Sequence, residues 1–256
     1  MIVGQAATKS PVTGGKANVI AAAWAAADVA AKMIKPGNTN AMVTEAIKKC
    51  ADAYGVKPIA GTVMHQMKRF VIDAAKTILL KQDDENKVDL CTFEQYEVYS
   101  IDIAMSTGEG KIRDSGARTT VFKRVVDQKY GLKVKASRAF FNDVIKTAPT
   151  MPFSLRSFAD EKAAKMGVRE CVSHNLLVGY PVLCEKDGEF VAHVKYTVLL
   201  LGSGTQKITG LPRPLITVAD DIKLPEDIVE LLATEDKQSK KAKKRADKKA
   251  TAITTA

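Results

Sequence analysis

The amino-acid sequence predicts an α+β fold, because segments with helical periodicity and segments with strand-like composition follow one another along its 256 residues. Two helical segments come first, and runs rich in β-branched and aromatic residues follow them. A helical cluster at roughly 136–178 is set between strands, which is typical of an inserted unit. We expect four parts: a first part of the core (1–111), an inserted basic loop and helical unit (112–181), return strands with a final helix (182–233), and a disordered lysine-rich tail (234–256).

The first helix is predicted in "NVIAAAWAAADVAAKMI", where Ile20, Trp24, Ala27 and Ala31 recur at helical spacing and "KPGN" ends the segment. A second helix is predicted in "AMVTEAIKKCADAYG", whose final glycine is a natural C-terminal stop. Asp28 interrupts the first apolar run, and no other stretch has the apolar length that spans a bilayer. We therefore expect no membrane insertion.

The clearest strand is predicted in "EVYSIDIAMSTGEGK", which leaves through a Ser-Thr-Gly turn. Shorter extended segments are predicted in "KPIAGTVMHQ", "FVIDAAKTILL" and "RTTVFKR". Within the insertion, helical periodicity returns in "SRAFFNDVIKTA", "SFADEKAAKMG" and "RECVSHNLL". The chain is then expected to return to strand over 182–201, to turn at "GSGTQ", to continue as strand in "KITGL" and to form a short helix in "LPEDIVELLATED".

Two charged residues stand in the middle of predicted strands. In "VAHVKYTVLL", alternation places His193, Lys195 and Thr197 on one face, so the lysine has a simple solvent-facing interpretation. Asp102 in "VYSIDIAM" needs a partner or solvent, because burying an unpaired carboxylate is costly. A lone histidine such as His65 in "GTVMHQM" is more often a satisfied core or surface residue than a ligand. One histidine, one carboxylate and one amine do not make a metal site.

Cysteine usage and the N-terminus indicate an intracellular protein. Cys50, Cys91, Cys171 and Cys184 are spread out without a C-x-x-C pair, which is typical of reduced thiols and of neither a disulfide framework nor a zinc site. The first residues lack the basic region, apolar run and cleavage site of a secretory signal.

The net charge of +10 is concentrated in the tail. Residues 237–249 hold eight Lys and Arg and one Asp, which leaves about +3 for the rest of the chain. Such a tail is expected to bind phosphate in a salt-dependent manner, although it also fits a solubilising tail or a nuclear-import signal. A second basic stretch runs into the insertion, where Phe140 and Phe141 are more often packing residues than stacking platforms for bases.

Four longer stretches resemble the proliferation-associated, ErbB-receptor-binding family: "VYSIDIAMSTGEGK", "YGLKVKASRAFFNDV", "MPFSLRSFADEKAAKMGVRECVSHNLL" and "YPVLCEKDGEFVAHVKYTVLL". The family consists of non-catalytic relatives of type-2 methionine aminopeptidases (peptidase M24), so the resemblance implies their pita-bread fold with a small helical, winged-helix-like insertion. It covers about Val12 to Leu211 and corresponds to the carboxyl-terminal portion of the fold. The family's amino-terminal portion is expected to be missing from this sequence.

The resemblance also implies a degenerate metal site. The active aminopeptidases hold two metal ions with two aspartates, a histidine and two glutamates, and both aspartates belong to the missing portion. The histidine matches His65, the glutamates fall on Asp102 and Lys195, and another pocket histidine falls on Asp73. We therefore expect no catalytic residue, no metal and no cofactor. We also expect Lys195 to replace the metal electrostatically by pairing with Asp102 inside the old pocket.

The function that the resemblance implies is a non-enzymatic regulator of translation, ribosome biogenesis and growth, in the cytoplasm and the nucleus or nucleolus. Its implied partners are structured RNA, ribosomal RNA and the large ribosomal subunit. The candidate RNA-binding residues are Lys111, Arg113, Arg118, Lys123, Arg124, Lys129, Lys133, Lys135 and Arg138 in the body, and Lys240, Lys241, Lys243, Lys244, Arg245, Lys248 and Lys249 in the tail.

Two alternatives remain open at this point: a metal-dependent aminopeptidase fragment, and a protein–protein adaptor in signalling or transcription. "IVELL" resembles the LxxLL-type helix that the family presents to transcriptional or receptor partners, through Ile228, Leu231 and Leu232. Short amphipathic helices of this kind more commonly cap a domain. Lys195 argues against the aminopeptidase, because a cation would remain among the metal ligands.

Overall fold

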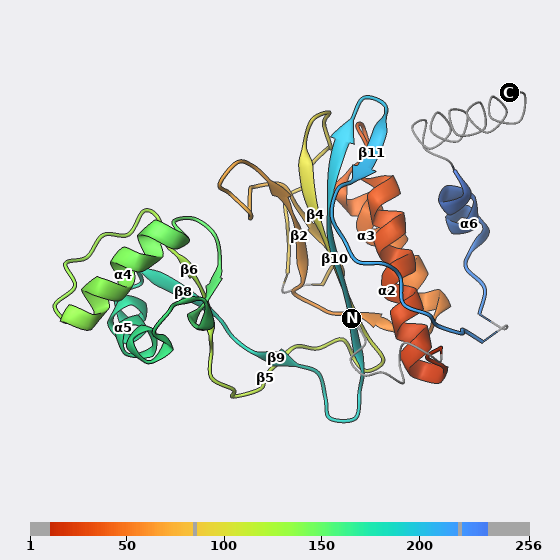
Figure 1. Cartoon of the computed structure of the whole chain (residues 1–256). Helices are drawn as coiled ribbons and strands as arrows, with labels where there is room; N and C mark the ends of the chain where they lie inside the picture. Colours follow the sequence, from red (N-terminus) through yellow and green to blue (C-terminus); the bar gives the residue numbers. More distant parts are fainter. Residues whose placement is uncertain (1–10, 84–85, 220–221, 235–256) are drawn as a thin grey trace, which may run out of the picture. The chain divides into compact units, whose positions relative to one another are not determined.

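The computed structural model describes residues 11–83, 86–219 and 222–234, and the chain divides into two compact units (Figure 1). The core unit is drawn from Met1–Met67, Asp73–Ile112 and Glu185–Ala256. The inserted unit is drawn from Lys68–Ile72 and Arg113–Cys184.

Three helices belong to the core unit: α2 (Gly14–Met33), α3 (Asn40–Ala53) and α6 (Glu226–Ala233). The buried side of α2 consists of eight alanines and two valines, and small side chains let neighbouring elements approach it closely. The predicted core-facing stripe is confirmed, because Ala27 is fully buried and Ile20, Trp24 and Ala31 pack against the main cluster while partly buried. The buried surface is wider than this stripe, since α2 packs against α3, α6 and the sheet, which bury alanines around most of its circumference.

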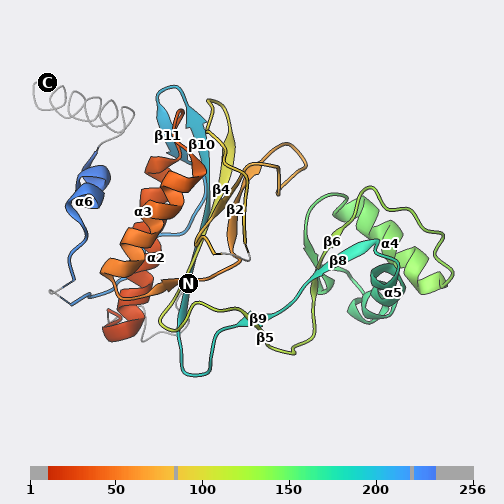
Figure 2. The ribbon, with the colours of Figure 1, turned by 180° about the vertical axis from the view of Figure 1, so that it is seen from behind.

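A six-stranded antiparallel sheet forms the other layer, in the order β11-β10-β4-β2-β3 with β1 paired to β4. Figures 1 and 2 show α2 and α3 on the same face of this sheet. Alternate residues of the strands point toward these helices and form the main hydrophobic cluster with them. The strands are β1 (Lys57–Pro58), β2 (Val63–Met67), β3 (Thr77–Leu79), β4 (Val98–Ser106), β10 (Val191–Leu201) and β11 (Gly204–Lys207).

The last long strand differs from its predicted bounds. β10 begins only at Val191, because the preceding "CEKDGEF" turns through Gly188, which has a φ of 89°. The Glu185 carboxylate accepts hydrogen bonds from the Ser106 hydroxyl (2.9 Å) and the Gly110 amide (2.8 Å), which ties this turn to the end of β4. The hairpin to β11 is also tighter than predicted, and β11 precedes most of "KITGL".

Gly110 is expected to tolerate no side chain. Its φ is 70°, and an added Cβ would lie 2.5 Å from the Pro58 carbonyl oxygen. Gly116 has a similar φ of 67° but open space around it, so it is a matched control. We expect Gly116→Ala to cost about 1–2 kcal/mol of unfolding free energy through backbone strain alone. Gly110→Ala should cost about 1–3 kcal/mol more through the clash, measured by urea denaturation. Equal losses would contradict this close approach.

The inserted unit combines two helices with short strands. α4 (Lys135–Thr147) and α5 (Glu161–Ser173) pack on a three-stranded sheet of order β7-β6-β8. A separate two-stranded pair joins the segments that enter and leave the unit. The remaining elements are β5 (Arg113–Asp114), β6 (Val121–Arg124), β7 (Phe153–Ser154), the 3-10 helix η1 (Leu155–Ser157), β8 (Leu177–Tyr180) and β9 (Leu183–Cys184).

One helix, α5, replaces the two helical segments predicted on either side of Gly167. An added Cβ at Gly167 would lie 2.5 Å from the Phe140 Cβ, so α4 and α5 approach each other closely at this glycine. Phe140 itself is buried and packs edge-on against Phe153 and Phe158. The packing interpretation of Phe140 is therefore confirmed, and the glycine marks a helix contact instead of a helix end.

The four cysteines are free, as predicted. Cys50 and Cys171 are buried, and Cys184 is exposed. Burial raises the pKa of the Cys171 thiol to about 11, so this thiol stays protonated at neutral pH. Within the described ranges, no helix is long and apolar enough to cross a membrane.

Candidate functional site

The face of the core sheet that points away from α2 and α3 brings the predicted metal-site positions together. In the β2–β4 pairing His65 lies opposite Ser100, and in the β4–β10 pairing Asp102 lies opposite Lys195. Ser100 and Asp102 are two residues apart and therefore share a face. The three strands thus place His65, Asp102 and Lys195 on one surface.

Asp102 is held by two side chains of β10, a lysine and a histidine. Its Oδ2 lies 2.5 Å from the Lys195 Nζ, and its Oδ1 contacts the Nε2 of His193. His193 was not among the predicted site residues, although its spacing of two from Lys195 already placed it on the same face. Asp102 is mostly buried, with 16% of its side chain exposed, while 61% of the Lys195 side chain is exposed.

The electrostatics at Asp102 favour its ionised form. Burial acts to raise its pKa, but the hydrogen bonds and positive charges of His193 and Lys195 outweigh burial and hold the pKa below its ordinary value. Asp102 is therefore a carboxylate at neutral pH, and its negative charge is offset by the lysine.

The predicted Lys195–Asp102 pair is confirmed, but its expected location inside a pocket is wrong for the described chain. Lys195 stands on the solvent-facing side of β10, as strand alternation allows, with Val194 and Tyr196 pointing to the core. The pair is an ion pair at the surface of an open sheet face, and such pairs contribute little to stability.

These side chains do not fit two divalent cations. An ammonium group lies at the position next to the Asp102 carboxylate where a metal would need a further anionic ligand. Among the described residues, no three His, Cys, Asp or Glu side chains come together in an arrangement that could hold a metal ion. No catalytic step through a metal is therefore derived for this site.

Replacing Lys195 with methionine is expected to lower the unfolding free energy by less than about 1 kcal/mol, because most of the lysine side chain is in water. Lys195→Glu should cost more, since it would place two carboxylates directly opposite each other on paired strands. Urea denaturation of both variants at pH 7 measures the difference. A loss near 3–5 kcal/mol for Lys195→Met would instead indicate a buried pair.

The pH dependence of this pair follows from the lowered pKa of Asp102. A group whose pKa is depressed by folding contributes stability above its unfolded pKa, here near 3.8, and loses it as the pH falls through the folded value. The stability difference between the wild type and Asp102→Asn should therefore be present at pH 5 and shrink below about pH 4. Denaturation at pH 5 and pH 3 measures it, and a difference that grows on acidification would contradict the lowered pKa.

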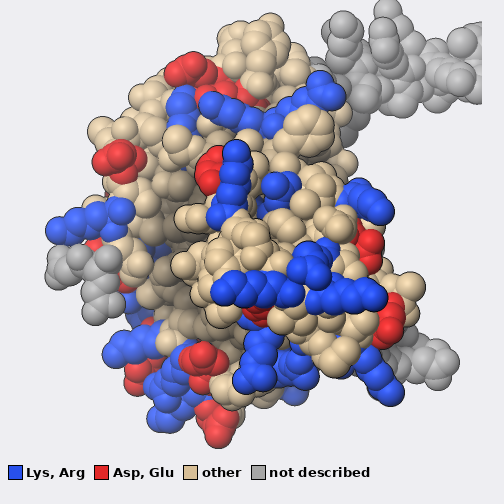
Figure 3. All heavy atoms as spheres, turned by 90° about the vertical axis from the view of Figure 1, so that its left-hand side faces the viewer, with Lys and Arg blue, Asp and Glu red and all other residues tan. Residues whose placement is uncertain are grey.

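A second candidate site is the basic surface of the inserted unit. This unit holds fifteen Lys and Arg and six Asp and Glu, whereas the core unit without residues 237–256 holds sixteen and twenty-two. The net charge of about +3 outside the tail is therefore the sum of two opposite values, +9 for the inserted unit and −6 for the core unit without residues 237–256. Lys and Arg side chains gather on the face seen in Figure 3.

A groove of about 720 Å³ runs between α5 and the strands β6 and β8 of the inserted unit. Arg118, Lys165 and Arg169 line it, and no carboxylate is among its lining residues within the described part of the chain. Its floor is apolar and includes Phe122 and Val168. Lys165 pairs with Glu161 at 2.6 Å on the same helix. Lys165 and Arg169 were missed by the sequence reasoning because they sit on a helix with mixed charges.

The predicted RNA-binding residues are distributed unevenly. Lys111 belongs to the core unit, whereas Arg113, Arg118 and Lys123 to Arg138 belong to the inserted unit. Arg138 donates to the carbonyls of Leu132 (3.1 Å) and Lys133 (3.0 Å), so it also fixes the loop before α4. The guanidinium of Arg124 lies over the Phe141 ring. Lys129, Lys133 and Lys135 are exposed.

The remaining predicted residues lie at the C-terminal end. The tail lysines and arginine, from Lys240 to Lys249, lie outside the described residues. Ile228 of α6 is buried, and Leu231 and Leu232 pack against the main cluster. Lys49 of α3 also pairs with Asp227 at 2.6 Å. The apolar face of α6 is thus turned toward the core unit, which favours the capping interpretation over a helix presented to a partner.

No known protein-family profile matches the chain. The chain is 49% identical over 203 residues to "ERBB-3 BINDING PROTEIN 1" of Solanum tuberosum, covering 79% of this chain and 52% of that protein. It is 42% identical over 247 residues to "Proliferation-associated protein A" of Dictyostelium discoideum, covering 96% and 64%. The chain therefore spans about half to two thirds of the length of these curated relatives.

Two further similarities concern the scaffold. The chain is 28% identical over 159 residues to "Methionine aminopeptidase 2" of Laccaria bicolor, covering 61% of this chain and 43% of that protein. The solved structure of a thermophilic Arx1 superposes with a TM-score of 0.79 at 27% identity, covering 88% of this chain and 66% of that one. The mixed helix-and-sheet core is thus a portion of the pita-bread fold, as predicted.

Proposed function

We propose, from the premise that this chain is a relative of the ErbB-3-binding and proliferation-associated proteins on the methionine aminopeptidase scaffold, that it is a non-enzymatic RNA- and ribosome-binding protein. Its proposed partners are structured RNA, ribosomal RNA and the large ribosomal subunit, with a role in translation, ribosome biogenesis and growth. The proposed location is the cytoplasm and the nucleus or nucleolus.

The observation that carries the proposal is the charge contrast between the two units. The inserted unit has an excess of nine positive charges, and the core unit without residues 237–256 has an excess of six negative charges. A polyanion would therefore be attracted to one unit and repelled by the other. The groove beside α5 adds an apolar floor under three cations, a combination that suits a phosphate backbone with exposed bases.

Fluorescence anisotropy with a labelled ribosomal RNA hairpin tests this proposal. We expect binding that weakens steeply between 50 and 200 mM salt, because phosphate contacts release counterions. A DNA duplex of equal length is the matched competitor. Equal affinity for both would reduce the proposal to general polyanion binding, and no binding at 50 mM salt would overturn it.

The proposal that the chain is not an enzyme rests on Lys195. A fixed cation paired with Asp102 opposes binding of divalent metals at that carboxylate. The test is to incubate the chain with Mn²⁺ or Co²⁺, measure the bound metal, and assay cleavage of a peptide that begins with Met. We expect neither stoichiometric metal nor turnover, and clear turnover would favour the aminopeptidase alternative.

A protein–protein adaptor is the second candidate function, including a transcriptional or receptor partner. The names of the relatives that refer to ErbB-3 favour it. Pulldowns with and without nuclease distinguish the two functions. Partners that survive nuclease treatment would favour the adaptor, whereas partners lost with the RNA would favour the RNA-binding protein.

A further inference from the structure

Two aromatic side chains of the inserted unit stack on each other at its surface. The Tyr130 and His174 rings lie nearly parallel, with their centroids 3.6 Å apart and an angle of 13° between their planes. Both residues are exposed, and 37% of Tyr130 is accessible to solvent. Among the described residues, the hydrophobic cluster of this unit includes neither of them. The stack therefore lies outside the core of the unit, and each ring has one face that its partner does not cover.

Hydrogen bonds on both sides hold the two rings in place. His174 caps the C-terminal end of α5, where its backbone amide donates to the Glu170 carbonyl (3.1 Å). The Glu170 carboxylate accepts from the backbone amides of Lys133 (2.6 Å) and Val134 (3.1 Å), which ties the loop that carries Tyr130 to the same helix. The stack is thus anchored before any ligand binds, and a preorganised ring loses little conformational freedom on binding.

The charge of the surrounding loop favours a polyanion. Residues 125–134, which lead from β6 to α4, contain Lys129 and Lys133 and one carboxylate, that of Asp127. Both lysines are exposed. The loop belongs to the inserted unit, which has an excess of nine positive charges. A phosphate backbone would therefore be attracted to the unit on which the two rings stand.

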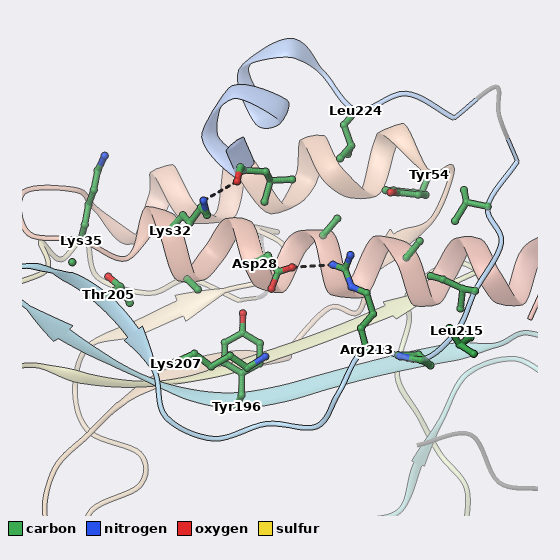
Figure 4. A pocket seen from close by; sticks show the side chains of 18 residues that line it. Asp28, Lys32, Lys35, Tyr54, Tyr196, Thr205, Lys207, Arg213, Leu215 and Leu224 are labelled. Atoms are coloured by element: carbon green, nitrogen blue, oxygen red, sulfur yellow. Dashed lines mark hydrogen bonds and ion pairs between the residues drawn. The ribbon is translucent and has the colours of Figure 1, made fainter. Parts of the chain in front are cut away.

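Several other aromatic rings of the chain are covered by cations. In the pocket of the core unit, Lys207 lies over the Tyr196 ring, 3.8 Å from its centroid (Figure 4). In the inserted unit, Arg124 lies 5.7 Å from the centroid of the Phe141 ring. In the part of the chain that the structure describes, no Lys or Arg lies over Tyr130 in this way. The outer face of the Tyr130 ring is therefore not occupied by a cation.

We propose that the Tyr130–His174 pair is a stacking platform for an unpaired base of RNA. The base lies on the outer face of Tyr130 as a third ring of the stack, with His174 as the ring beneath. Tyrosine and histidine are among the side chains on which splayed RNA bases stack. This inference rests on the proposed RNA-binding function, and it adds which part of the RNA is recognised: a loop or a bulge, in place of a continuous helix.

Fluorescence of 2-aminopurine tests the platform, because stacking on an aromatic ring quenches it. The probe is an RNA hairpin that carries this base in its loop, and the fully paired stem without the loop is the matched ligand. We expect the wild-type chain to quench the loop base. Tyr130→Leu should abolish the quenching and weaken hairpin binding about tenfold, which is within the range for the loss of one stacked base. Its affinity for the paired stem should change less than about twofold, because phosphate contacts remain.

Two further variants and the salt dependence distinguish stacking from a structural role. Tyr130→Phe keeps the ring and should quench and bind as the wild type does. Tyr180→Leu, at another exposed tyrosine of the inserted unit, is the matched control and should also behave as the wild type. The slope of log affinity against log salt should be the same for Tyr130→Leu and the wild type, because no phosphate contact is removed.

The outcomes separate this inference from the proposed function. Wild-type binding of both RNAs, with no loss of hairpin affinity in Tyr130→Leu, would overturn the platform and leave RNA binding intact. Equal losses for hairpin and stem in a folded variant would also overturn it, as would an equal loss in Tyr180→Leu. No binding of either RNA by the wild type would overturn both. If Tyr130→Leu does not fold, photocrosslinking of the wild type to 5-iodouridine in the loop decides: a cross-link to Tyr130 or His174 is expected, and cross-links confined to other residues would overturn the platform.

Discussion

Replacing Arg118, Lys165 and Arg169 together with glutamine is expected to weaken binding of ribosomal RNA about 100-fold at 100 mM salt. These side chains line one groove beside α5 without a carboxylate among its described lining residues, so a phosphate backbone would contact several of them at once. Each contact removed should cost roughly a factor of five, and the slope of log affinity against log salt should fall by about two to three. Anisotropy across a salt series measures both quantities.

The matched control changes the same charge in the core unit. Lys48, Lys57 and Lys87 are exposed, so their replacement by glutamine lowers the net charge equally without touching the groove. We expect this control to weaken binding less than about threefold, through the long-range field alone. Equal losses in the two triple variants would show that net charge, and not the groove, determines RNA affinity.

Gly167→Ala is expected to destabilise the inserted unit, although alanine ordinarily stabilises a helix by about 0.5–1 kcal/mol relative to glycine. The new Cβ would lie 2.5 Å from the Phe140 Cβ and 2.9 Å from the Ala136 carbonyl oxygen. Because both neighbours are firmly placed in α4, the two helices must separate. We expect a net loss of about 1–3 kcal/mol and faster amide exchange in α4 and α5.

The control for this substitution is Gly15→Ala, at a helical glycine of α2 with open space around it. It should be neutral or stabilising. Trp24 fluorescence reports on unfolding of the core unit. In the Gly167→Ala variant, the urea midpoint of the core unit should therefore equal that of the wild type. A Gly167→Ala variant as stable as the wild type would mean that α4 and α5 pack less closely than the structure shows.

The strand pattern was largely predictable because burial on one side of a sheet leaves a period of two. Alternation alone placed His193 on the same face as Lys195, and Ser100 on the same face as Asp102. The strand register then made Asp102 and Lys195 direct neighbours. Strand pairing is a property of the fold, so spacing in the sequence could not reveal it. The exposure of Lys195 was not predictable from the resemblance, because the resemblance describes a pocket formed by a longer protein.

The inserted unit shows where local reasoning fails. The helical segments predicted on either side of Gly167 form the single helix α5. The glycine is needed there because a side chain would collide with Phe140 of α4. The groove cations on α5 had no sequence signal of their own, since Lys165 and Arg169 share a helix with Glu161 and Glu170. Charge averaged over the whole body also hid the contrast between units, because the boundary of a unit is known only from contacts.

We expect the inserted unit, and not the tail alone, to bind the ribosome. The most direct measurement is the salt dependence of binding to purified large ribosomal subunits, using the whole chain, a chain that ends at Ala233, and that shorter chain with the three groove substitutions. We expect the shorter chain to bind with a reduced salt slope, and the substituted version to lose most of the remaining affinity. If removing the tail abolished all binding to the subunits, the inserted unit would not be a docking surface.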